Sequence, residues 1–210
     1  MTSAPAAARP ALVRRGSRLV YLTLGYNAVE AVVSLAAGLV AGSVALVGFG
    51  VDSGIEVTAS GAALWRLAAD LDPVRRARAE RKTHAVIGAS FLALAAYVAL
   101  DSAATLWRRE GPAPSAVGLA ILTLSVLVMP VLARAKRRVA RALGSRALEA
   151  EATQTSVCAY LSVIALGGVA LNAFLGWWWA DPVAAVLMVP LIAREGVAGF
   201  RGEAACAGCG

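Results

Sequence analysis

The chain has 210 residues, of which 59% are hydrophobic and 16% are charged, and its mean hydropathy is +0.70. A soluble globular domain is about half apolar and about a quarter charged, and a disordered chain combines low hydrophobicity with many charges. The composition therefore excludes both classes. The net charge of +7 is typical either of nucleic-acid-binding proteins or of membrane proteins with basic cytoplasmic loops.

Six long segments with few or no charges follow one another along the chain. A helix needs about 20 apolar residues to cross a bilayer. We therefore predict an all-α polytopic membrane protein, a bundle of six transmembrane helices. The spans are expected near 18–40, 43–66, 84–107, 115–134, 147–172 and 177–194. They divide the chain into a cytoplasmic N-terminal segment (1–17), a transmembrane domain (18–195) and a short cytoplasmic C-terminal tail (196–210).

The basic residues lie almost entirely on one side of these spans. Eighteen of the 20 lysines and arginines fall in the N-terminal segment, the segments after spans two and four, and the C-terminal end. The other side holds Arg108 and Arg109. The positive-inside rule places both termini in the cytoplasm of an integral membrane protein, in the cytoplasmic membrane if the cell is bacterial. Contacts with anionic lipid headgroups follow from this distribution. Nucleic acid is not expected as a partner, because no aromatic platform accompanies the charge.

Two carboxylates lie inside the second span. Asp52 and Glu56 are four residues apart, which places them on one helix face, one turn apart. Ionisable groups inside a membrane are costly and mark functional sites by default. Two anions so close repel each other unless a cation or protons join them. The pair indicates a cation site, and the alternative is a polar clamp between two helices.

The fifth span contains a second pair with the same spacing, Gln154 and Cys158. Facing Asp52 and Glu56, it completes a cage of three oxygen donors and one sulfur donor. Such a set suits zinc or a similarly soft divalent ion. The alternatives are that Gln154 hydrogen-bonds a neighbouring helix and that Cys158 is a small buried apolar residue.

Four other polar residues of the spans are candidates for an accessory role. Asn27 and Glu30 lie about one turn apart in span one and either line the ion path or brace the site. Asp101 in span three indicates a structural hydrogen bond or a proton path. Glu151, near the start of span five, gains from the helix dipole, and the alternative is that it gathers cations at a cytoplasmic mouth.

Two features lie at or beyond the last span. Asp181 precedes Pro182, which predicts the N-cap of span six. Cys206 and Cys209 form a C-x-x-C pair in the tail. The tail pair indicates soft-metal capture, a redox pair or an incidental flexible segment. A structural disulfide is not expected in reducing cytoplasm.

Three stretches together resemble one family of membrane proteins. The run G-S-V-A-L-V-G-F-G-V-D-S-G-I-E at 42–56 resembles the second transmembrane helix of the cation diffusion facilitators. The run A-L-E-A-E-A-T-Q-T-S-V-C at 147–158 is similar to their fifth helix, and G-W-W-W-A-D-P at 176–182 to the entry into their sixth. The resemblance is to a truncated branch without the C-terminal cytoplasmic domain, near the transmembrane-163 type.

This resemblance implies export of Zn²⁺ or a related divalent cation in exchange for protons. It assigns Asp52 and Glu56 to the ligand positions of helix two, and Gln154 and Cys158 to those of helix five. The chain departs from the family pattern because Glu56 stands in place of Asp, and Gln154 and Cys158 stand in place of His and Asp. These changes bear on metal identity and on proton coupling. A homodimer through span contacts is one possible assembly, although the soluble dimerisation domain that is usual in the family is missing, and the sequence does not decide the oligomeric state.

Two function classes other than transport are possible for such a chain. An enzyme is not expected, because the sequence pairs no nucleophile with a base, and no prosthetic group is expected beyond the transported cation. The alternative to a transporter is a membrane interaction or metal-sensing protein that keeps a vestigial site. Movement of zinc across a liposome membrane separates the two.

Overall fold

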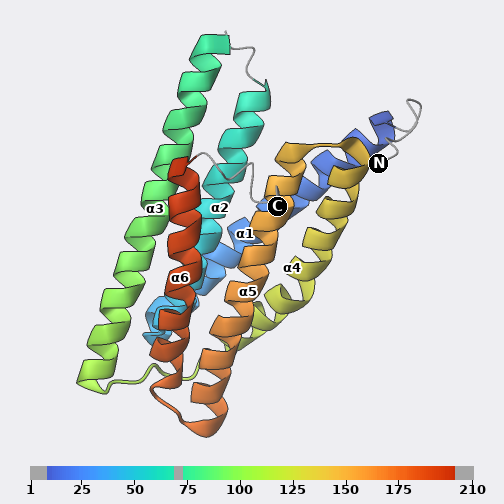
Figure 1. Cartoon of the computed structure of the whole chain (residues 1–210). Helices are drawn as coiled ribbons and strands as arrows, with labels where there is room; N and C mark the ends of the chain where they lie inside the picture. Colours follow the sequence, from blue (N-terminus) through green and yellow to red (C-terminus); the bar gives the residue numbers. More distant parts are fainter. Residues whose placement is uncertain (1–8, 69–72, 202–210) are drawn as a thin grey trace.

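The computed structural model consists of helices joined by short connections (Figure 1). It describes the backbone of residues 9–68 and 73–201, and the side chains of residues 10–61, 85–145 and 148–200. Within these ranges there is no strand. The six helices are α1 (Arg9–Ala41), α2 (Val44–Ala68), α3 (Pro73–Arg108), α4 (Ala116–Leu143), α5 (Arg146–Leu175) and α6 (Ala180–Arg201).

Each helix overlaps one predicted span, so the all-α polytopic class is confirmed. Five helices of the described part are long and apolar enough to cross a membrane, namely α1, α3, α4, α5 and α6. The helix outside this set is α2, which carries two acidic residues among several glycines. Helices suit a bilayer because they satisfy their backbone hydrogen bonds internally. The last span begins later than predicted, since Trp177–Trp179 precede α6, with the first and third rings stacked 5.2 Å apart.

The bundle consists of three closely packed helix pairs, and α2 contacts at least one helix of each pair. The most extensive contacts join α4 to α5, α3 to α6 and α1 to α2 (Figure 1). In addition α2 contacts α3, α5 and α6. On α2 and the helices it contacts, Leu46, Phe49, Val98, Leu161 and Met188 are completely buried. Residues 44–50 of α2 are all buried, and so are Asp52, Ser53 and Glu56, whereas Thr58 is exposed.

Small residues let α1 and α2 approach closely. A Cβ atom on Gly50 of α2 would lie 2.8 Å from the backbone nitrogen of Leu35 on α1. A Cβ atom on Gly38 of α1 would lie 2.8 Å from the backbone nitrogen of Val47. Both distances are too short for a side chain, so these glycines set the spacing of the two helices. Close packing of this kind is a principal source of helix association in membranes.

The N-terminus of α2 is held by a carboxylate from the beginning of α6. Asp181 accepts hydrogen bonds from the Ser43 hydroxyl (2.5 Å), the Val44 amide (3.0 Å) and the Ala45 amide (3.4 Å). The prediction that Asp181 caps its own helix is wrong, because α6 already begins at Ala180. An anion at a helix N-terminus satisfies free amide groups and complements the helix dipole. Asp181 therefore fixes the start of the helix that carries Asp52 and Glu56.

We expect Asp181→Ala to lower the stability of the protein by about 2–4 kcal/mol, because three buried donors lose a charged acceptor. Thermal unfolding of the purified protein in detergent measures this as a lower Tm. Glu110→Ala removes an exposed carboxylate from the connection after α3 and serves as the control. A Tm for Asp181→Ala equal to that of the control would contradict the anchoring role.

Candidate metal centre

The acidic pair of α2 lies in the protein interior. Asp52 exposes 3% of its surface and Glu56 exposes 4%. Both carboxylates project from the same side of α2, as their spacing of one turn predicts. Neither forms a salt bridge with a lysine or arginine in the part of the chain that the structure describes. Two buried carboxylates without a basic partner require protons or a cation for neutrality.

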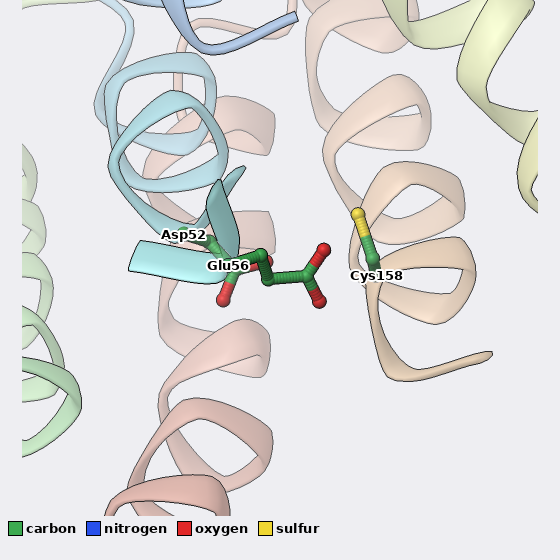
Figure 2. Close-up of side chains that lie close together, drawn as sticks. All are labelled: Asp52, Glu56 and Cys158. Carbon is green, nitrogen blue, oxygen red and sulfur yellow. The ribbon is translucent and has the colours of Figure 1, made fainter. Parts of the chain in front are cut away.

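Cys158 of α5 faces this pair and is completely buried. Figure 2 shows the Glu56 side chain extending from α2 towards the Cys158 sulfur, with Asp52 behind it. One ligand atom from each of the three residues lies within 4.8 Å of the other two. A zinc ion holds oxygen ligands at about 2.0–2.2 Å and sulfur at about 2.3 Å, so its ligand atoms lie roughly 3.5 Å apart. The three groups are therefore close to a common coordination distance, and small side-chain rotations bring them there.

Asn27 of α1 orients one of the carboxylates. Its side-chain nitrogen donates a 2.6 Å hydrogen bond to Glu56 Oε2, and only 2% of the residue is exposed. A hydrogen bond of this kind restricts the rotamers of a ligand before a metal binds. Of the two roles expected for Asn27, the contact supports bracing of the site.

Glu30, one turn after Asn27 on α1, is completely buried. Its Oε2 atom accepts a 2.8 Å hydrogen bond from the hydroxyl of Ser53, the neighbour of Asp52 on α2. The same oxygen lies 3.8 Å from the sulfur of Cys158. Glu30 thus joins α1 to both helices that carry the predicted ligands, a position that the sequence alone did not reveal.

Several oxygen atoms of this cluster are buried and have no hydrogen-bond partner among the described residues. They include Asn27 Oδ1, Glu30 Oε1 and Asp52 Oδ2. A buried polar atom without a partner costs about 1–3 kcal/mol, and more if it is charged. These three oxygens are therefore free to accept a hydrogen bond or to bind a cation. They are a natural donor set for a cation.

The other predicted site residues have separate surroundings. Gln154 is half-buried and lies one turn before Cys158 on α5, and its role as a ligand stays a prediction. Asp101 accepts a 3.1 Å hydrogen bond from Tyr97, one turn earlier on α3. This bond agrees with the expected structural role of Asp101. Cys206 and Cys209 lie outside the described residues.

Glu151 pairs with Lys136, a lysine that we expected in the cytoplasmic segment after span four. The Lys136 ammonium lies 3.2 Å from Glu151 Oε2 and 3.1 Å from the Thr155 hydroxyl, and Lys136 is completely buried. Glu151 also accepts a 3.3 Å hydrogen bond from Ser60 of α2. The predicted fourth span ended at residue 134, whereas α4 continues to Leu143, so Lys136 lies inside the bundle.

The spacing of the apolar residues in this part of the sequence could have predicted that Lys136 is buried. The buried residues Met129, Leu132, Ala133, Lys136, Val139 and Ala140 of α4 recur every three or four positions. Lys136 therefore continues the apolar stripe that faces α5. The Lys136 ammonium pairs with Glu151 of α5. Glu151 lies seven residues before Cys158, which is about 10 Å along the helix axis.

The arrangement can bind a divalent cation through carboxylate and thiolate groups. Carboxylates alone suit Mg²⁺, Ca²⁺ or Mn²⁺, whereas a thiolate favours zinc and softer ions. Both ligand types must lose their protons to bind a metal, so metal and protons compete for the site.

The comparisons with known proteins agree with this chemistry. Residues 20–202 match the family described as "Cation efflux transmembrane domain". This match covers all six helices apart from the first residues of α1. A search of curated proteins finds no significant match.

We expect Glu151→Gln to lower the stability by about 2–3 kcal/mol, because it leaves the buried Lys136 ammonium without its counter-ion. Glu151 is partly exposed, so this loss is smaller than that for a fully buried ion pair. The Tm in detergent measures the change. Replacing Lys136 by Met in the same chain should restore part of the loss, since no unpaired charge then remains. Arg138→Gln removes an exposed charge of α4 and is the control. Strictly additive effects of the two substitutions would contradict a direct ion pair.

Proposed function

The chain belongs to the cation efflux transmembrane domain family, and we propose that it exports a divalent cation of the zinc class from the cytoplasm in exchange for protons. The observation that carries the proposal is the buried convergence of Asp52, Glu56 and Cys158 within 4.8 Å. The proposed metal site lies between α2 and α5, with Gln154 as its fourth ligand. Zn²⁺ is the expected substrate, and no prosthetic group takes part.

The ligand chemistry supports zinc over a hard cation. Cys158 offers one sulfur, and Asp52 and Glu56 offer oxygens. A hard cation such as Mg²⁺ requires six oxygen ligands in near-octahedral geometry. A four-ligand set with one thiolate matches the tetrahedral coordination of zinc. Cadmium, a softer divalent ion, is the expected competitor at this site.

Proton exchange follows from the need for neutrality inside the bundle. When no metal is bound, protons on the carboxylates and the thiol remove the charge that burial disfavours. When a divalent cation binds, it displaces these protons. Gln154 cannot take part in this exchange because an amide does not titrate in the physiological range. The coupling groups are therefore Asp52, Glu56 and Cys158.

The distribution of basic residues supports the proposed orientation and the lipid partners. Seventeen of the 20 lysines and arginines, without the buried Lys136, lie on the side that we assign to the cytoplasm, together with both termini. These seventeen residues are expected to contact anionic lipid headgroups. We expect two copies to associate through their transmembrane helices.

Transport by the purified chain in liposomes tests the proposal. A zinc-sensitive dye inside the liposomes reports uptake after Zn²⁺ is added outside. We expect uptake to be faster when the lumen is more acidic than the outside, because protons leave as zinc enters. A proton carrier that collapses the pH gradient should slow it. Uptake that ignores the pH gradient would rule out proton antiport, and zinc binding without any uptake would favour a metal-sensing protein.

Substitutions in α2 then test the site itself. Asp52→Asn and Glu56→Gln keep the size of the side chain but remove its charge, and each should reduce uptake at least tenfold. Glu149→Gln removes an exposed carboxylate at the start of α5 and should leave uptake unchanged. Normal uptake by both α2 variants would show that the ion crosses elsewhere.

A further inference from the structure

We infer that Glu30 of α1 is a metal ligand of the proposed site, so that three helices rather than two enclose the cation. This inference rests on the proposed function, because Glu30 takes the fourth position of the same tetrahedral centre in place of the uncharged Gln154. Glu30 supplies the carboxylate that the fifth helix lacks in this chain, where Gln154 carries no charge.

The first argument is the position of the Glu30 carboxylate relative to Cys158. Glu30 Oε2 lies 3.8 Å from the Cys158 sulfur. An oxygen and a sulfur bound tetrahedrally to one zinc ion lie roughly 3.6 Å apart, given bond lengths of about 2.1 and 2.3 Å. The two atoms are therefore already at the separation that a shared ion requires. In the structure the Cys158 thiol donates a hydrogen bond to this oxygen, and Glu30 is not in the group of three residues whose ligand atoms lie within 4.8 Å of one another. A shared ion therefore replaces the thiol hydrogen and draws the Glu30 carboxylate towards Asp52 and Glu56.

The second argument is the free hydrogen-bonding capacity of Glu30. One of its oxygens accepts a hydrogen bond from Ser53, which fixes the side chain between α1 and α2. The other oxygen, Oε1, is buried and has no partner within the described ranges. A carboxylate that is completely buried yet only half used is costly as a structural element. A cation that the carboxylate binds through both of its oxygens uses the free Oε1 as well as the Oε2 that faces Cys158.

The third argument is charge. Glu30, Asp52 and Glu56 are each at least 96% buried, and Lys136, the fully buried cation of the described part, pairs with Glu151 instead. If these carboxylates had a purely structural role as buried ion pairs, each of them would need a basic side chain as its partner. The three carboxylates and the thiol form no salt bridge among the described residues, so one divalent cation would balance two of them and protons would balance the others.

The rigid contact between α1 and α2 supports a shared site. Gly38 and Gly50 bring the two helices together on one side of the centre. Asn27, one turn before Glu30, holds Glu56 of α2 through its 2.6 Å hydrogen bond. The Asn27 and Glu30 side chains therefore act from one face of α1, with Asn27 orienting a ligand and Glu30 supplying one.

Metal binding to the purified full-length chain tests this role. Co²⁺ is the probe, because its absorption reports coordination geometry and bonding to sulfur, and Zn²⁺ competition gives the affinity for zinc. Glu30→Gln keeps an acceptor for Ser53 but removes the anionic ligand. We expect it to weaken Zn²⁺ binding about tenfold or more and to change the ligand-field bands of Co²⁺. The sulfur-to-cobalt band from Cys158 should remain.

Three further variants complete the design. Glu30→Asp keeps the carboxylate on a shorter side chain and should retain more affinity than Glu30→Gln, which a purely structural role of Glu30 does not predict. Glu149→Gln is the matched control for loss of a carboxylate. Asp52→Asn reports the proposed site independently of Glu30.

The outcomes separate the two claims. Wild-type affinity and an unchanged cobalt spectrum in Glu30→Gln, with loss of binding in Asp52→Asn, would overturn the role of Glu30 and leave the proposed function intact. No binding of Co²⁺ or Zn²⁺ by the unmodified chain would overturn both. If Glu30→Gln does not fold, Glu30→Asp decides, because an unchanged affinity and an unchanged spectrum in that variant contradict ligation.

Discussion

A carboxylate that is removed from both water and basic side chains must find a cation or a proton, and this constraint governs the centre of the molecule. Asp52 and Glu56 lie on the most enclosed helix of the bundle, where neither lipid nor solvent can stabilise their charge. Their neighbours Cys158 and Glu30 add a thiol and another acid rather than a base. Protons can neutralise all of these groups, and a divalent metal can replace two of the protons, which is the physical basis of the exchange that we propose.

The surrounding fold keeps α2 in register with its partners. Asp181 holds the beginning of α2 from α6, and Gly50 allows α1 to pack directly against it. Further along, Ser60 of α2 hydrogen-bonds Glu151, whose own charge is balanced by Lys136 of α4. These contacts connect α2 to α1, α4, α5 and α6 through polar groups or close backbone packing. Lys136 forms its salt bridge with Glu151, and the acids of the centre form none among the described residues.

The helices and the shared face of the acidic pair could be predicted from the sequence, whereas the contacts between helices could not, for a physical reason. Long apolar runs predict the helices, and the spacing of Asp52 and Glu56 predicts that they share a face. The contact of Glu30 with Cys158 joins positions 128 residues apart, and that of Asp181 with Val44 joins positions 137 apart. In a membrane the lipid-facing and the protein-facing sides of a helix are both apolar, so the pattern of residues does not reveal which helices meet.

The account depends most on one claim, that Cys158 and the carboxylates bind the same ion. X-ray absorption at the zinc edge tests it on zinc-loaded protein in which Cys206 and Cys209 are changed to serine, so that Cys158 is the one remaining cysteine. We predict one sulfur at about 2.3 Å from zinc with oxygens completing the shell, and loss of this sulfur in Cys158→Ser. A shell without sulfur, or one that Cys158→Ser leaves unchanged, would contradict the account.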